Sequence, residues 1–204
     1  MKNQDDILQT IIDKQQIAEV VSNWAFFRDR REWDNLKDCF TPDGTMVTLF
    51  YTGPIGGFLE YVKKMAESKH LVANTQITIN KNKAICESNT LFSGRIRIDN
   101  MDADMTVFCR VFDFFEKGND EIWRIKKRVV DYEKDRIDPI GFRGLFWYLF
   151  YPKKKLENYP DACKHFCYLI ESKVKIDPEK LKTVITKDSE AEADLTKEMA
   201  LWLA

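Results

Sequence analysis

The stretch WAFFRDRREWDNLKDCFTPDGTMV, residues 24–47, lies where one kind of sequence pattern gives way to another. Before it, apolar residues recur every three to four positions over residues 4–28, which predicts a long amphipathic helix. Residues 41–44, TPDG, have the composition of a tight turn. They precede a predicted strand over residues 45–51. Asp29 falls where the long helix is expected to end. It either caps a short helix over residues 30–39 or faces a pocket.

The rest of the sequence adds one more predicted helix and four predicted strands, which together indicate an α+β fold. Glycines and a proline at 53–57 mark a loop before a predicted third helix over 58–67. Strand-like segments follow at 70–80, 84–98, 104–116 and 121–132, with short polar connections. We therefore predict helices packed on one face of a strongly curved antiparallel sheet. Residues 1–138 would form this domain. Residues 139–204, aromatic-rich from 141 and then helical, would form a C-terminal extension packed on it.

Composition narrows the classes of partner. Lys and Arg number 32 against 33 Asp and Glu, so bulk charge favours neither nucleic acid nor an anionic membrane as a partner. No apolar run reaches the length of a membrane span, and the N-terminus is polar, so we expect no signal peptide. The five cysteines are odd in number and scattered, which indicates reduced thiols in a cytoplasmic protein.

Several motifs together resemble a known family. They are FRDRREWDNL at 27–36, FTPDG at 40–44, His70, ITIN at 77–80 and WRI at 123–125. The sequence over roughly residues 4 to 135 resembles the SnoaL-like branch of the nuclear-transport-factor-2-like (NTF2-like) superfamily. That resemblance implies a cone whose curved sheet and helices enclose a deep, mostly apolar pocket. Members include ketosteroid isomerase, scytalone dehydratase, bile-acid 7α-dehydratase, polyketide cyclases and limonene epoxide hydrolase.

The resemblance also implies a catalytic pair. Scytalone dehydratase and bile-acid 7α-dehydratase use an Asp after the first helix and a His at the start of the strand after the third helix. Asp29 and His70 fall on these two positions. A carboxylate that orients an imidazole fixes its tautomer, and such a His can remove and return a proton. This chain departs from the relatives at two tyrosine positions: Trp24 replaces the Tyr of the bile-acid enzyme, and Arg28 replaces the Tyr of scytalone dehydratase.

Further residues are candidates for contact with a substrate. Asn74 shares strand parity with His70. Arg110 interrupts an apolar strand and would either enter the pocket or be solvated on the outer face. The predicted substrate-binding residues are Trp24, Thr48, Tyr51, Asn74, Phe108 and Arg110.

A metal site is not expected. Cys163 and Cys167 share a helix face, His165 points away from it, and no second cluster of ligands exists in the sequence. We therefore predict no metal and no cofactor.

The resemblance and the residues together favour a cofactor-independent, dehydratase-like lyase or isomerase that acts on a small apolar or polycyclic substrate. The alternative is a non-catalytic ligand-binding or oligomeric assembly domain. A weaker third reading is the structural β-subunit of a ring-hydroxylating dioxygenase. We expect a small-molecule ligand, no nucleic acid, no membrane, and a homodimer or homotrimer.

Overall fold

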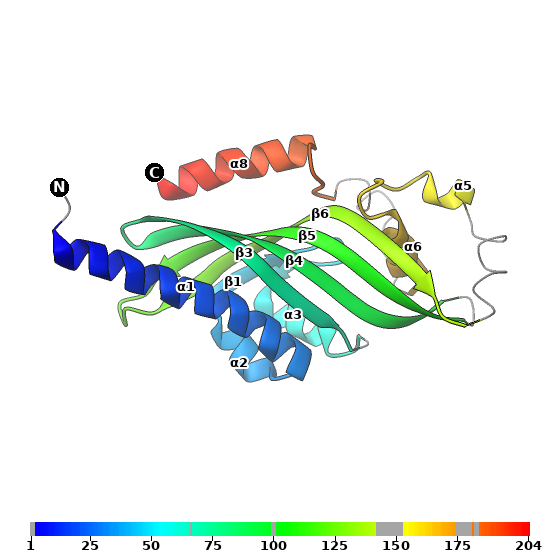
Figure 1. The fold of residues 1–204 in the computed structure, drawn as a ribbon, viewed down its shortest axis with the longest axis horizontal. Coiled ribbons are helices and arrows are strands. Elements are labelled where there is room, and N and C mark those ends of the chain that lie inside the picture. Colours follow the sequence, from blue (N-terminus) through cyan, green and yellow to red (C-terminus); the bar gives the residue numbers. More distant parts are fainter. Residues whose placement is uncertain (1–2, 66, 99–100, 142–152, 174–180, 182–183) are drawn as a thin grey trace.

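The computed structural model describes residues 3–65, 67–98, 101–141, 153–173, 181 and 184–204. In the described part of the chain, all of the named strands lie before residue 140, together with helices α1, α2 and α3 (Figure 1). In chain order the elements are α1 (Gln4–Arg30), α2 (Trp33–Asp38), β1 (Phe40–Val47), β2 (Thr52–Pro54), α3 (Ile55–Val62), β3 (Lys69–Asn80), β4 (Lys83–Ile98), β5 (Met101–Lys117), β6 (Trp123–Pro139), α5 (Lys153–Leu156), α6 (Lys164–Lys173) and α8 (Glu190–Leu203).

Helix α1 has well-defined ends. Asn3 and Asp6 form a capping box at its start, where each side chain accepts a hydrogen bond from the other residue's backbone N–H. At its end, Arg31 adopts a left-handed conformation with φ of 61°. The next helix, α2, begins after Glu32. Asp29 therefore lies in the last turn of α1, and the alternative in which it caps a following helix is wrong.

The six strands form one sheet in the order β2-β1-β6-β5-β4-β3. All neighbouring pairs are antiparallel except β1 and β6, which run parallel, so the expectation of a fully antiparallel sheet is wrong at this one pair. The predicted turn at 41–44 lies inside β1, where the register against β6 is interrupted between Phe40 and Thr45. Gly44 is required here, because a Cβ would lie 2.9 Å from the Phe40 Cβ and 3.0 Å from the Ile125 carbonyl oxygen.

Both faces of the sheet are covered, by different parts of the chain. Helix α1 crosses beside β3, and α2 and α3 lie on the same side, whereas α8 lies on the opposite side of the sheet (Figure 1). The buried core under α8 consists of Ile85, Phe112, Phe114, Val129 and Leu195. The predicted α+β layout is confirmed.

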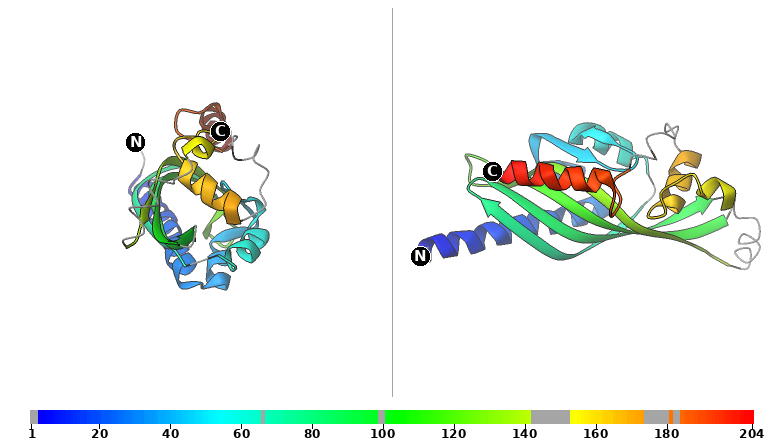
Figure 2. Two further views of the ribbon diagram at one scale, coloured as in Figure 1. Left: turned by 90° about the vertical axis from the view of Figure 1, so that its right-hand side faces the viewer. Right: turned by 90° about the horizontal axis from the view of Figure 1, so that it is seen from above.

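The C-terminal extension contributes to the interior as well as to the surface. Helix α6 packs across one end of the curved sheet (Figure 2), where Phe166, Leu169 and Ile170 join the core around Tyr132 of β6. Most of the aromatic-rich segment that begins at residue 141 lies outside the described residues. The domain division at residue 138 stays a prediction. No helix in the described part of the chain is long and apolar enough to cross a membrane. All five cysteines are buried with free thiols.

Candidate active site

A cavity of about 950 Å³ lies between the inner face of the sheet and helices α1, α3 and α6. Its volume is at the upper end of the range for small-molecule sites. The wall is mostly apolar: Val21, Met46, Phe50, Phe58, Val62, Met65, Val72, Phe92, Val107, Val111, Phe166, Leu169 and Ile170 contribute to it. A second hollow of about 760 Å³, around Lys37, Asp43 and Arg124, shares no lining residue with the cavity and contains no histidine.

Asp29 and His70 form a pair at the cavity wall. The Asp29 Oδ1 lies 2.7 Å from the His70 Nδ1, and the Asp29 Oδ2 accepts a hydrogen bond of 2.9 Å from the His70 backbone N–H. Both side chains are nearly buried, with 10 % of His70 and 11 % of Asp29 exposed. The last turn of α1 supplies the carboxylate and the first residues of β3 supply the imidazole. The two contacts together hold the ring in one orientation.

The environment keeps His70 neutral and available as a base. Burial lowers the pKa of His70 below its ordinary value of 6.5, and the charges of Arg28 and Arg128 act in the same direction. Asp29 opposes this decrease through its hydrogen bond and its charge. Because a carboxylate anion only accepts hydrogen bonds, the 2.7 Å contact with Asp29 favours the tautomer in which Nδ1 carries the proton and Nε2 keeps its lone pair. No described residue forms a hydrogen bond with Nε2, and His70 lines the cavity.

Aromatic and ionic contacts also support the Asp29–His70 pair. Trp24 meets the His70 ring edge-on at 5.2 Å between centroids, and Phe92 lies 5.5 Å from it. The Arg128 guanidinium lies 4.2 Å from the centre of the Trp24 ring. It also makes a buried two-point ion pair with Asp113 at 2.6 and 2.7 Å. Asp113 therefore fixes Arg128, Arg128 fixes Trp24, and Trp24 supports the imidazole.

The structure places only part of the predicted substrate-binding set in the cavity. Trp24 and Thr48 line it. Tyr51 does not, since its hydroxyl donates to the Pro54 carbonyl over Gly53 and Gly57. Asn74 is exposed at a bulge in β3 with φ of 51°, and Phe108 is 39 % exposed. The predicted positions of Tyr51, Asn74 and Phe108 in the pocket are wrong.

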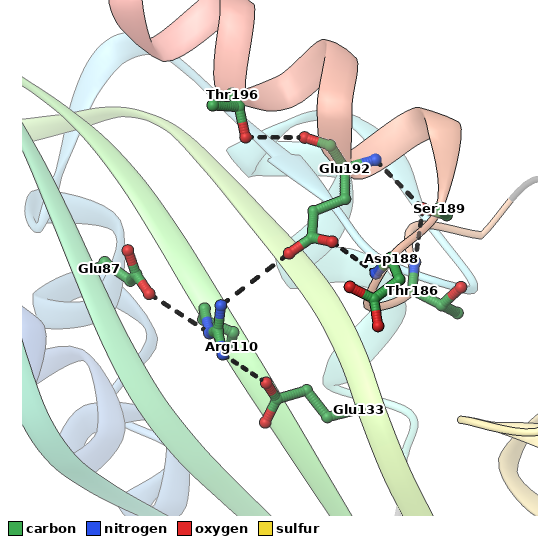
Figure 3. Close-up of polar contacts among 8 residues, drawn as sticks. All are labelled: Glu87, Arg110, Glu133, Thr186, Asp188, Ser189, Glu192 and Thr196. Atoms are coloured by element: carbon green, nitrogen blue, oxygen red, sulfur yellow. Dashed lines mark hydrogen bonds and ion pairs between the residues drawn. The ribbon is translucent and has the colours of Figure 1, made fainter.

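The predicted pocket position of Arg110 is also wrong, because Arg110 points to the outer face, toward α8 (Figure 3). Its guanidinium lies 2.8 Å from Glu133, 3.3 Å from Glu87 and 3.9 Å from Glu192. Strand alternation explains this, because its neighbours Cys109 and Val111 line the cavity. Arg110 connects α8 to the sheet.

Some cavity residues were not predicted from the sequence. Arg28 lines the cavity in the last turn of α1, and Phe166 enters from α6. Arg28 continues the buried face of α1 that includes Val21 and Trp24, so its helical spacing was the available signal. Phe166 had no comparable signal. In the described part of the chain, no group of three His, Cys, Asp or Glu side chains is arranged to hold a metal ion.

Comparisons with known proteins agree with this architecture. Among curated relatives, an uncharacterized protein of Emericella nidulans is 27% identical over 176 residues, covering 79% of this chain and 71% of its own. A PEP2-like protein of Fusarium vanettenii is 25% identical over 209 residues, covering 95% of this chain and 86% of its own. Among solved structures, hexachlorocyclohexane dehydrochlorinase LinA-type3 from Novosphingobium barchaimii has a TM-score of 0.55 at 14% identity, covering 66% of this chain and 94% of its own. An NTF2-like protein with a cystatin-like fold from Novosphingobium aromaticivorans has a TM-score of 0.54 at 13% identity, covering 64% and 90%.

These structural similarities are below 25% identity and establish the NTF2-like fold alone. The family follows from the sequence. The model of the SnoaL-like domain matches residues 9–129, which is more than half of the chain and includes both Asp29 and His70. The chain belongs to the SnoaL-like domain family.

Proposed function

We propose that the protein is a cofactor-independent lyase or isomerase of the dehydratase type, with His70 as the general acid and base. The observation that carries the proposal is the buried Asp29–His70 pair, 2.7 Å apart, at the wall of a large apolar cavity. A dehydrochlorinase is among the proteins of the same fold. That reaction is an elimination, which is the chemistry proposed here.

The proposed reaction begins when His70 Nε2 removes a proton from a carbon next to a carbonyl group. The electron pair of that C–H bond becomes the second bond of a C=C, and a hydroxyl group on the next carbon departs with its own bonding pair. The His70 imidazolium returns the proton to this hydroxyl, which leaves as water. Asp29 orients the ring and stabilises the imidazolium between the two transfers. If no leaving group is present, return of the proton to another carbon gives isomerisation.

The size and polarity of the cavity fit a small apolar or polycyclic substrate. Phe50, Phe58 and Tyr61 lie together on one side of it, with Phe50 stacked against both other rings at 6.3 and 5.3 Å between centroids. Burial of such a ligand against aromatic and aliphatic side chains supplies affinity, and the few polar groups set its orientation.

The test is turnover of a panel of β-hydroxy ketones on fused-ring skeletons, followed by loss of water in mass spectra and by deuterium uptake next to the carbonyl in D₂O. We expect His70→Gln to lower the rate by about 10²- to 10⁴-fold. The matched control is His165→Gln, which removes the second of the two histidines and leaves the cavity wall intact. Equal rates in wild type and His70→Gln would refute the proposal. Ligand binding without turnover or exchange would favour the non-catalytic ligand-binding domain.

Self-association remains a prediction. Helix α8 covers part of the outer face of the sheet. By contrast, Ile7, Leu8, Ile11 and Ile12 on the first half of α1 are between 41% and 59% exposed. We propose that this apolar face of α1 contributes to a homodimer or homotrimer. Light scattering of wild type and Ile11→Asp tests this, and a wild type that is monomeric at micromolar concentration contradicts it.

A further inference from the structure

Arg28 is a buried basic residue of the cavity wall that has no counter-charge in direct contact within the described part of the chain. It lines the cavity and is 7 % exposed. Within the described residues its guanidinium makes no hydrogen bond and no ion pair, and its carbon lies 5.6 Å from the centre of the Trp33 ring. By contrast, Arg128 in the same cavity is paired at two points with Asp113. A buried charge is normally paired.

The adjacent carboxylate, that of Asp29, does not fill this role. Asp29 follows Arg28 in the sequence and interacts with it through charge alone. Both Asp29 oxygens are directed to His70, one to the ring nitrogen and one to the backbone N–H. Asp29, the side chain that would be expected to pair with Arg28, is thus engaged with His70, and among the described residues the Arg28 guanidinium has no carboxylate in direct contact.

Arg28 is nevertheless charged at neutral pH. Burial lowers its pKa to about 10, which is still well above neutral pH, and the neighbouring Asp29 limits the decrease. Its charge is close enough to His70 to lower the pKa of the imidazole. An arginine fork matches a carboxylate in geometry and charge, with two parallel N–H···O contacts.

We propose that the cavity selects a substrate with a carboxylate group, and that Arg28 is the residue that binds this carboxylate beside His70. The inference rests on the proposed function for the reaction at His70, but the binding contact does not require turnover. The apolar wall accommodates the carbon skeleton, and Arg28 fixes its acidic end. The chemical class is therefore an aromatic or alicyclic hydroxy ketone that also carries a carboxylate, rather than one without an acidic group.

The test compares two probes of the same shape, naphthalene-2-carboxylate and naphthalene-2-carboxamide, by isothermal titration calorimetry at neutral pH. In wild type we expect the carboxylate to bind at least about tenfold more tightly, because charge-assisted bidentate contacts are about twice as strong as neutral ones. In Arg28→Met the preference should disappear. The matched control is Arg30→Met, which removes an arginine from the same helical turn whose side chain is 66 % exposed. It should leave the preference unchanged.

A second measurement covers the case in which neither probe binds. Because the unpaired guanidinium is buried at a cost, Arg28→Met should unfold at a higher urea concentration than ligand-free wild type. A lower midpoint, or a variant that does not fold, would overturn the inference by showing that Arg28 already has a structural partner. Equal binding of the two probes by wild type, or a preference that survives in Arg28→Met, would also overturn it. His70→Gln should keep the carboxylate preference, which separates this inference from the failure of the proposed reaction.

Discussion

Replacement of Asp29 by Asn tests the coupling between Asp29 and His70 directly and needs no substrate. The substitution keeps the size of the side chain and its ability to accept from His70 Nδ1, and it removes the charge 2.7 Å from that atom. A hydrogen bond to a charged group contributes about 1.5–3 kcal/mol, against about 1 kcal/mol for a neutral one. A difference of about 1.4 kcal/mol between protonation states corresponds to one pKa unit. We therefore expect the pKa of His70 to fall by about one in Asp29→Asn.

The assay is NMR titration of the imidazole Cε1–H in a His165→Gln background, which leaves His70 as the single histidine. The pKa of His70 should fall rather than rise in Asp29→Asn, because in the wild type burial already lowers this pKa and Asp29 partly offsets the decrease. Removal of the Asp29 charge leaves burial and the neighbouring arginines unopposed. If His70 titrates identically in the two proteins, the residues are not coupled, and the general-base role loses its physical basis.

The same pair makes stability depend on pH. Since the folded-state pKa of His70 is lower than its ordinary value of 6.5, the unfolded chain takes up the proton first as the pH falls. This contribution to stability is fully present above pH 6.5 and is lost as the pH falls toward the folded-state pKa. In Asp29→Asn the loss extends to lower pH, which urea unfolding across the acid range measures.

Three further predictions concern the framework around the cavity. Arg128→Met leaves the carboxylate of Asp113, which is 0 % exposed, without its partner. Urea unfolding should show that the free energy of unfolding falls by about 3–5 kcal/mol, and a second substitution, Asp113→Leu, should restore most of it. If Arg128→Met alone is as stable as wild type, the buried ion pair is contradicted. Burial and the charges of Glu192 and Glu133 raise the pKa of Asp131 from 3.8 to about 7, and neither of its carboxylate oxygens has a hydrogen-bond partner among the described residues. The folded state therefore keeps the Asp131 proton to a higher pH than the unfolded chain does, and the free energy of unfolding falls as the pH rises from 3.8 to about 7. Asp131→Asn should remove this pH dependence and raise the free energy of unfolding by about 1–3 kcal/mol above pH 7. An unchanged pH dependence would contradict the raised pKa of Asp131. Leu195→Ala in the core under α8 should cost about 2–4 kcal/mol in chemical unfolding and leave the His70 titration unaltered, whereas an altered titration would show that the two faces of the sheet are coupled.

The dyad could be predicted from the sequence because it lies at the ends of two strongly patterned elements. Helix α1 has regular apolar spacing and clear capping residues, and β3 begins within one residue of its predicted start. Asp29 lies next to the end of α1 and His70 next to the start of β3, so the prediction of these element ends also placed the two residues. The family positions then identified which acid and which imidazole to pair, which periodicity alone does not do.

The cavity wall was harder to predict, for reasons that differ between residues. Asn74 has the same parity as His70, but the bulge between Ala73 and Thr75 breaks the alternation, and Asn74 is exposed. On β5 the alternation is regular, yet both faces of the strand are covered, so apolar content did not show that Arg110 points outward. Phe166 reaches the cavity from a helix almost 100 residues after His70 in the sequence, and no local pattern encodes that distance.

The charges of Arg28 and Asp29 near His70 would connect substrate binding with proton transfer. Arg28 is a buried cation whose charge lowers the pKa of His70. A carboxylate bound to Arg28 neutralises that charge, so the effect of Arg28 on the imidazole is largely cancelled when the substrate arrives. His70 then becomes a stronger base in the complex than in the free protein, while Asp29 holds its ring in place. The unpaired arginine thus makes the strength of the base depend on the presence of an acidic substrate, and a neutral molecule of the same shape would leave His70 a weaker base.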